Sequence, residues 1–216
     1  MRGCDSPART TAEAGLVDVA TLAPGIDLDM RYAGADNFTG APVDGYEAPR
    51  CYLHRRPAEA LARVERTLRA DGLALRVHDC YRPVRAVRRF VAWAEDLEDE
   101  RSKARYYPRV DKAALIPDYI SASSGHSRAA TVDVALLRCP GRDRPCEPLD
   151  MGTPFDFFDP AAHTDSPSAT PDQRARRERL RAAMAAGGFR NYPLEWWHYT
   201  FEPEPTPDTA YDAPIR

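Results

Sequence analysis

The 216-residue sequence predicts an α+β fold in a single domain, with a mostly antiparallel central sheet and helices packed around it. Two observations lead to this prediction. Segments that alternate apolar and polar residues are interspersed with segments of helical period, yet too few β-α-β units recur for a doubly wound parallel sheet. A chain of this length buries one good hydrophobic core, and nothing in the pattern requires a second.

The first half of the chain contains one expected helix and one expected strand. The first fifty residues carry turn signals, APG, YAGADNFTG and APVDGYEAP, so we expect loops and short edge strands there. A helix is expected from Pro57, with apolar residues at helical spacing up to Leu68 and a stop at Gly72. The alternation in LALRVHDCY predicts a strand over residues 73–81.

The second half shows the same mixture of patterns. Helical spacing, capping residues and strand alternation define its elements. The expected elements are a helix from Pro83 that includes Leu97, a Ser/Gly-rich loop that leads into a strand over 131–137, a helix capped by Thr170 and ended by Gly187, and a final strand, LEWWHYTF, over 194–201.

The patterning divides the chain into three parts. Residues 1–28 form an irregular N-terminal segment, residues 29–202 the folded domain, and residues 203–216 a Pro-rich C-terminal tail. We expect the tail to be an extended wrap or disordered.

The charge balance excludes several classes of partner. A formal net charge of −3 leaves no basic stripe for nucleic acid and no polybasic patch for a membrane surface. No apolar run approaches the ~20 residues of a membrane-spanning helix. The first residues lack the apolar middle of a signal peptide, so an exported protein would need a signal that this sequence does not contain. We expect a small-molecule partner, and the sequence indicates no particular oligomeric state.

The five cysteines give one indication of compartment. Cys139 and Cys146 bracket a Pro/Gly-rich turn, as a short cross-hairpin disulfide requires, and Cys51 and Cys80 could form a second bridge, with Cys4 left over. Two bridges favour an oxidising compartment and thus a periplasmic or exported protein. The alternative is a cytoplasmic enzyme in which all five cysteines are reduced, small apolar side chains.

The segment LEWWHYTF contains two polar residues that a buried strand does not explain. Glu195 and His198 are three residues apart, separated by two tryptophans that by themselves suit a packed core. A carboxylate and an imidazole in an apolar setting need partners. Because residues i and i+3 of a flat strand point to opposite faces, we expect the chain to twist, bulge or turn between them.

His126 and Asp133 are the candidate partners. Zinc takes histidine nitrogen and carboxylate oxygen, and a catalytic site keeps three protein ligands. In one unbroken strand, a separation of seven positions would place the two side chains on opposite faces. The loop before Thr131 allows the chain to turn and bring His126 back beside Asp133. Asp133 has apolar neighbours and would need a cation or several donors. The alternatives are a partly exposed strand aspartate and a histidine that caps the loop.

These residues resemble a known family. SSGHSRAATVDVAL resembles the S-x-H-x-x-G-x-A-x-D zinc motif of the VanX-type D-alanyl-D-alanine dipeptidases of peptidase family M15, and LEWWHYTF resembles the E-x-x-H segment of that family. MRYAGADNFTGAPVDGYE, DCYRPVRAV and MGTPFDFFD resemble further family segments in the same order. The resemblance covers roughly Asp29 to Phe201, most of the chain.

The resemblance implies a role for each matching residue. His126, Asp133 and His198 would bind one zinc ion, Glu195 would be the catalytic base, and Arg82 would stabilise the charge that develops on the scissile carbonyl.

The same resemblance implies how a substrate is held. Tyr32 and Asp156 match the positions that receive the ammonium of a dipeptide, and Ser124 matches a serine near its carboxylate. The implied reaction is zinc-dependent hydrolysis of D-alanyl-D-alanine or a close D,D-dipeptide by water that zinc and Glu195 activate. The alternatives are a zinc D,D-carboxypeptidase acting on longer peptidoglycan peptides and a non-catalytic metal- or peptide-binding relative. The physiological role is left open.

Three positions depart from the family pattern. The glycine and the alanine of the zinc motif are Ala129 and Thr131 here, and neither position supplies a ligand. If the motif uses glycine for a left-handed turn, Ala129 carries a small strain. Cys80 stands where the prototype dipeptidases have glycine. The remaining histidines match nothing in the family and are expected to be structural or surface residues; they are His54, His78 and His163.

Overall fold

A mixed β-sheet crosses the centre of the computed structural model, which describes residues 4–141 and 144–216. Within these residues its six strands are β3 (Asp27–Leu28), β5 (Leu73–Asp79), β6 (Thr131–Arg138), β7 (Glu147–Pro148), β8 (Phe189–Asn191) and β9 (His198–Phe201). The order is β3-β5-β6-β9-β8, with β7 paired to the end of β6. The β3–β5 pair is parallel and the other described pairs are antiparallel. The expected α+β fold with a mostly antiparallel sheet is confirmed.

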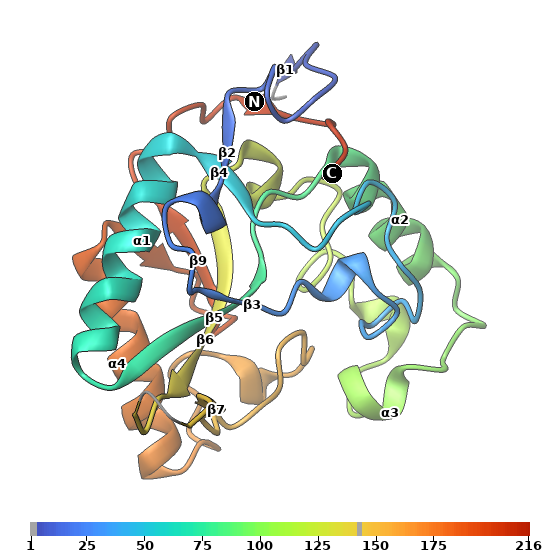
Figure 1. The fold of residues 1–216 in the computed structure, drawn as a ribbon. Coiled ribbons are helices and arrows are strands. Elements are labelled where there is room, and N and C mark those ends of the chain that lie inside the picture. The colour runs from blue at the N-terminus through green and yellow to red at the C-terminus, as the bar shows by residue number, and fades with distance from the viewer. Residues whose placement is uncertain (1–3, 142–143) are drawn as a thin grey trace.

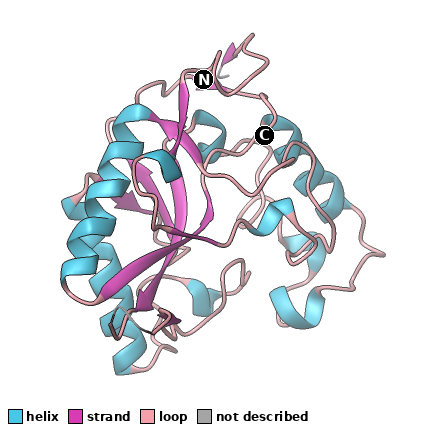
Figure 2. Ribbon diagram, in the orientation of Figure 1, coloured by secondary structure: helices cyan, strands magenta, loops and turns pink. Residues whose placement is uncertain are grey.

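Helices lie on both sides of this sheet (Figure 1). They are α1 (Arg55–Ala70), α2 (Val84–Glu95), the short α3 (Lys103–Tyr106) and α4 (Pro171–Ala186). Helices α1 and α4 contact each other and pack on the sheet, whereas α2 and α3 lie on the other side among long loops (Figure 2). Helix α4 has the expected N-cap, because Thr170 and Gln173 form a reciprocal capping box.

Both ends of the chain meet on one side of the domain. The two-residue strands β1 (Cys4–Asp5) and β10 (Thr209–Ala210) pair in parallel, and β2 (Leu16–Asp18) pairs with β4 (Tyr52–His54). The Pro-rich tail is an extended wrap, since Tyr211, Ala213 and Ile215 are buried. The division of the chain at residues 28 and 203 stays a prediction.

The structure corrects several element boundaries. Helix α1 begins at Arg55, two residues before Pro57, which is tolerated because the first-turn N–H that proline lacks has no intrahelical partner. Helix α2 ends at Glu95, so the inclusion of Leu97 in this helix was wrong, and Leu97 is 52% exposed. Two carbonyls just beyond this helix end accept hydrogen bonds from the buried Lys112 ammonium. Strand β5 stops at Asp79 rather than at residue 81.

Both suggested disulfides, Cys51–Cys80 and Cys139–Cys146, are formed, and Cys4 is free and exposed. A search of the described helices found none that is both long enough and apolar enough to cross a membrane.

Candidate metal-binding and catalytic site

Three polar residues lie in a row across neighbouring strands of the sheet. Asp79 at the end of β5 is paired with Asp133 on β6, and Asp133 is paired with His198 at the start of β9. A register irregularity between Val77 and Asp79 shifts the end of β5. Because residues paired across antiparallel strands lie on the same face, the backbone register alone brings these side chains together.

His126 joins this row from the short helix η4 (Gly125–Arg128). The Ser124 hydroxyl caps that helix by accepting from the His126 N–H (3.2 Å), and Ala129 then turns the chain into β6 with φ 56°. The Nδ1–H of His126 donates to the Cys80 carbonyl oxygen at 2.7 Å, so Nε2 carries the lone pair. This nitrogen lies 3.3 Å from Asp133 Oδ2 and 3.4 Å from His198 Nδ1. The expected turn before β6 therefore places His126 beside Asp133.

The resulting cluster fits a metal ion. One ligand atom each from His126, Asp133 and His198 lies within 4.8 Å of the others. Asp133 is 2% exposed, and its Oδ1 has no hydrogen-bond partner among the described residues, although His198 Nδ1 is 3.1 Å away. Two imidazole nitrogens and one carboxylate oxygen are ligands that zinc accepts, and a cation would compensate the buried charge.

The protonation equilibria of the cluster reflect its burial and its charges. Burial alone would raise the pKa of Asp133. The neighbouring imidazoles of His126 and His198 nevertheless hold this pKa below its ordinary value. Burial alone would lower the pKa of His198, but the adjacent Asp133 carboxylate, with Oδ1 3.1 Å from Nδ1, raises it. The carboxylate is therefore ionised at neutral pH, as a metal ligand must be.

Glu195 and His198 converge because the chain makes a turn between them. The expected strand over 194–201 was wrong in its first half, since β9 begins only at His198 and the His198 N–H donates to the Glu195 carbonyl at 3.3 Å. The Asn191 side chain bonds the carbonyls of both residues. As a result Glu195 Oε2 lies 3.4 Å from His198 Nδ1. Burial raises the pKa of Glu195 to about 7.

The two tryptophans fix this turn by packing. Trp196 and Trp197 are almost fully buried, and their rings are nearly perpendicular, at 87°. The Trp196 indole N–H donates to Thr153 Oγ1 at 2.8 Å, and Trp197 packs edge-on against Phe155. The expectation that both tryptophans are core residues is confirmed, and their burial holds Glu195 in place on one side of the turn.

Arg82 is half-buried, with its side chain 14% exposed, and contacts on several sides orient it. Its guanidinium donates to Asp79 Oδ2 from Nε (3.0 Å) and lies 2.9 Å from the same oxygen through Nη2. It lies over the rings of Tyr32 (5.3 Å) and Phe90 (5.0 Å), and Nη2 is 3.7 Å from Asp133. These contacts hold the planar donor group beside the metal cluster.

Asp79 is a site residue that the sequence reasoning missed. It is fully buried and also accepts from the Tyr46 hydroxyl at 2.7 Å, and His126 Nδ1 lies 3.5 Å from its Oδ2. Burial raises the pKa of Asp79. The available signal was a carboxylate on the strand face that is otherwise formed by Leu73, Leu75 and Val77, three residues before Arg82.

A second polar pair lies within the same cavity. The Tyr32 hydroxyl donates to Asp156 Oδ2 at 2.7 Å, and Asp156, only 6% exposed, has a left-handed backbone with φ 60°. Burial raises the pKa of Asp156 well above its ordinary value. A ligand that brings a positive charge to this carboxylate would compensate its desolvation.

One cavity of about 210 Å³ contains the whole site. Its volume is below the ~300–1,000 Å³ of pockets for drug-sized ligands, which favours a small substrate. Apolar side chains such as Phe38 and Phe158 form much of the wall, and Asp118 and Tyr192, which the sequence reasoning did not single out, also line it. All eight residues selected from the sequence line this cavity: Tyr32, Arg82, Ser124, His126, Asp133, Asp156, Glu195 and His198.

The other sequence-selected positions lie outside the cavity lining. His54 bonds Thr206 through Nε2 (2.9 Å), and the buried His78 ring stacks on Phe155. The hydroxyl of Thr131 bonds that of Thr200 at 2.9 Å.

Comparisons with known proteins identify the family to which the chain is similar. Residues 12–215 match the peptidase M15 family, described as D-ala-D-ala dipeptidase. The chain is 43% identical over 206 residues to a D-alanyl-D-alanine dipeptidase of Streptomyces coelicolor, covering 95% of this chain and 99% of that protein. It is 37% identical to one of Enterococcus faecium (94% and 100%) and 33% identical to one of Escherichia coli (85% and 83%).

One solved structure is also similar. The vancomycin resistance D,D-pentapeptidase VanY in complex with Zn(II) aligns with a TM-score of 0.41 at 18% identity, over 70% of this chain and 73% of that one.

Proposed function

Because the chain belongs to the D-Ala-D-Ala dipeptidase family of M15 peptidases, we propose that it hydrolyses D-alanyl-D-alanine, or a closely related D,D-dipeptide, to free D-amino acids with one zinc ion. One observation carries this proposal. A single small cavity contains both the cluster of His126, Asp133 and His198 and the buried Tyr32–Asp156 pair. The first suits a catalytic metal, and the second suits the free amine of a short peptide.

The chain's own side chains account for the proton transfers. Zinc held by the three ligands would supply a Lewis acid that polarises the scissile carbonyl and acidifies water. Glu195, whose pKa lies near 7, accepts a proton from the attacking water and then donates it to the leaving amine. Its position 3.4 Å from a ligand nitrogen suits this role.

Arg82 stabilises the charge that develops on the carbonyl oxygen. Its guanidinium is fixed by Asp79 and by two aromatic faces, so little reorganisation is needed during the reaction. Fixed donors in a water-poor site contribute more than the same donors would in water.

The two ends of the substrate are assigned to opposite partners. Asp156 and Tyr32 receive the ammonium, since a buried carboxylate is a strong partner for an amine. Ser124 lies within 3.5 Å of Arg82 Nη1 and is assigned to the carboxylate end.

The main alternative is a D,D-carboxypeptidase that acts on longer wall peptides. Such an enzyme needs space beyond the amine-binding group for the rest of the peptide, whereas Tyr32 and Asp156 occupy that position. Comparing hydrolysis of D-Ala-D-Ala with that of its N-acetylated form separates the two, because a carboxypeptidase would accept both.

The central test is a D-alanine release assay. D-Ala-D-Ala should be hydrolysed, activity should be lost after treatment with a chelator, and it should return on addition of zinc. Zinc binding without release of D-alanine would instead support a non-catalytic relative, and full activity in chelator would contradict the metal assignment.

The disulfides support a location in an oxidising compartment, the periplasm or the cell exterior. Mass spectrometry of the unreduced protein from its native host should find four of the five cysteines oxidised. Five free thiols would favour the cytoplasm.

A further inference from the structure

The Cys51–Cys80 disulfide is adjacent to the candidate metal ligand His126, which contacts the Cys80 carbonyl. Both cysteines are fully buried, and the bridge spans 29 residues that include β4, α1 and β5. Cys51 directly precedes β4 and Cys80 directly follows β5. The Tyr81 N–H donates to the Tyr52 carbonyl at 3.0 Å, so a backbone hydrogen bond continues the same connection.

Residue 80 contacts the candidate ligand His126 through its backbone. Its carbonyl oxygen accepts the Nδ1–H of His126 at 2.7 Å, and two residues later the Arg82 N–H donates to the His126 carbonyl at 3.2 Å. The segment 79–82 therefore holds both the ring and the main chain of His126. Partners of this kind set the tautomer and orientation of a metal-binding histidine.

The residues that flank Cys80 and Tyr81 also contribute to the site. Asp79, which is fully buried, and Arg82 lie on either side of Cys80 and Tyr81 and form an ion pair beside the cluster. A shift of the backbone at residue 80 would thus move the carbonyl that orients His126 and the guanidinium of Arg82 together. A displacement of ~1 Å in a catalytic group can reduce a rate about 100-fold.

We propose that the Cys51–Cys80 disulfide is a positioning device for the metal site, which fixes residue 80 so that its carbonyl aligns His126 with Asp133 and His198. The inference rests on the proposed zinc site. It makes zinc affinity depend on a covalent bond between two residues that themselves contact neither metal nor substrate.

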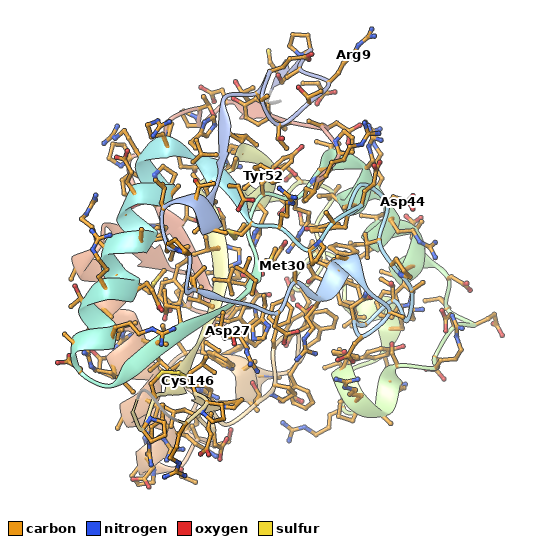
Figure 3. All side chains as sticks on the ribbon, viewed as in Figure 1. Arg9, Asp27, Met30, Asp44, Tyr52 and Cys146 are labelled. Atoms are coloured by element: carbon orange, nitrogen blue, oxygen red, sulfur yellow. A yellow bond between two sulfur atoms is a disulfide. The ribbon has the colours of Figure 1, made fainter. Side chains whose placement is uncertain are left out.

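The second disulfide provides a matched control. Cys139 and Cys146 close a hairpin with a sequence separation of seven, and Arg69 contacts both sulfur atoms from α1. Neither residue lines the site cavity. In Figure 3, Cys146 lies near the bottom of the view, well below Tyr52, the neighbour of Cys51.

The experiment measures zinc affinity by competition with a chromogenic chelator on the metal-free protein. The C51A/C80A protein should bind zinc about 10- to 100-fold more weakly than wild type, and the C139A/C146A protein within about twofold of wild type. Thermal unfolding should show that both pairs stabilise the fold. Equal zinc affinities for the two double variants would overturn the inference.

A second variant distinguishes the effect of the covalent bond from the effect of side-chain packing. C51V/C80A restores apolar volume without the covalent link, and circular dichroism verifies its fold if C51A/C80A does not fold. Weak zinc binding by folded C51V/C80A supports the inference, and wild-type affinity overturns it. For the same variant we expect a lower kcat with KM nearly unchanged, because Tyr32 and Asp156 lie on other elements.

The outcomes also separate this inference from the proposed function. The chelator assay needs no substrate, so a wild-type protein that binds zinc but hydrolyses no dipeptide refutes the function and leaves the inference to be decided by the variants. A wild-type protein that binds no zinc overturns both.

Discussion

The two halves of the cavity are built in different ways. Two of the three candidate ligands of the metal half lie on strands, since Asp133 and His198 are direct partners across β6 and β9, while His126 lies in the short helix η4. The amine half is formed by loops: Tyr32 lies in the short helix η2 (Arg31–Ala33), and Asp156 lies in the connection between β7 and α4 with φ 60°.

The difference shows what each half requires for its geometry. In the metal half, the sheet ladder fixes the spacing through backbone hydrogen bonds, whatever the side chains are. The loop of the amine half has no such ladder and is held by the buried Arg177 of α4, which donates to the carbonyls of Met151, Ala161 and His163. We therefore expect substitutions to affect metal binding and substrate binding separately.

The largest effect is expected in the metal half. Glu195→Ala removes the proposed base but no ligand, so kcat should fall about 10³-fold while zinc content stays at one ion per chain. Steady-state kinetics and elemental analysis measure the two quantities. The His126→Ala variant should instead lose zinc, and near wild-type turnover by Glu195→Ala would contradict its role as base.

Arg177→Met tests the hydrogen bonds from Arg177 that hold the loop of the amine half. Three carbonyls lose their buried donor, so the free energy of unfolding should fall by about 3 kcal/mol. KM for the dipeptide should rise with zinc affinity unchanged. Arg174→Met, an exposed change on the same helix, serves as the control in urea unfolding. A loss of zinc in Arg177→Met would show that the two halves are not independent.

Asp156→Asn tests the amine half directly. Loss of the carboxylate charge should reduce kcat/KM for D-Ala-D-Ala about 30-fold, or about 2 kcal/mol. The low activity on the N-acetylated dipeptide should hardly change, because that substrate has no ammonium. If both substrates lose activity equally, Asp156 does not recognise the amine.

The smallest expected effect concerns Ala129, whose left-handed backbone precedes β6. Glycine adopts φ 56° without strain, so Ala129→Gly should stabilise the protein by about 0.5 kcal/mol after the entropy of glycine is subtracted. The neighbouring Ala130→Gly should destabilise it, since Ala130 has no positive φ. Chemical denaturation measures the free energy of unfolding of both variants. Destabilisation by Ala129→Gly would contradict the prediction that the backbone of Ala129 is strained.

Local patterns were sufficient for most elements and insufficient at their ends. Helical spacing identified α1, capping residues identified α4, and the alternation of β5 and β6 was visible in the sequence. The assignment of Leu97 to α2 was wrong because the buried Lys112 ammonium bonds carbonyls just beyond the helix end, a contact from another segment. Asp79 was missed as a site residue because its partners Tyr46 and His126 are far from it in sequence.

The sequence by itself determined which side chains the candidate site has: two histidines and a carboxylate suited to a metal, a glutamate three residues before one of the histidines, and an arginine. These are properties of residue type and spacing, which can be read from the sequence without a structure. Only the tertiary structure decided that Glu195 and His198 converge, because the turn between them depends on the Asn191 amide and on two buried indoles. It also decided that the Cys80 carbonyl orients His126, since that contact joins segments 46 residues apart.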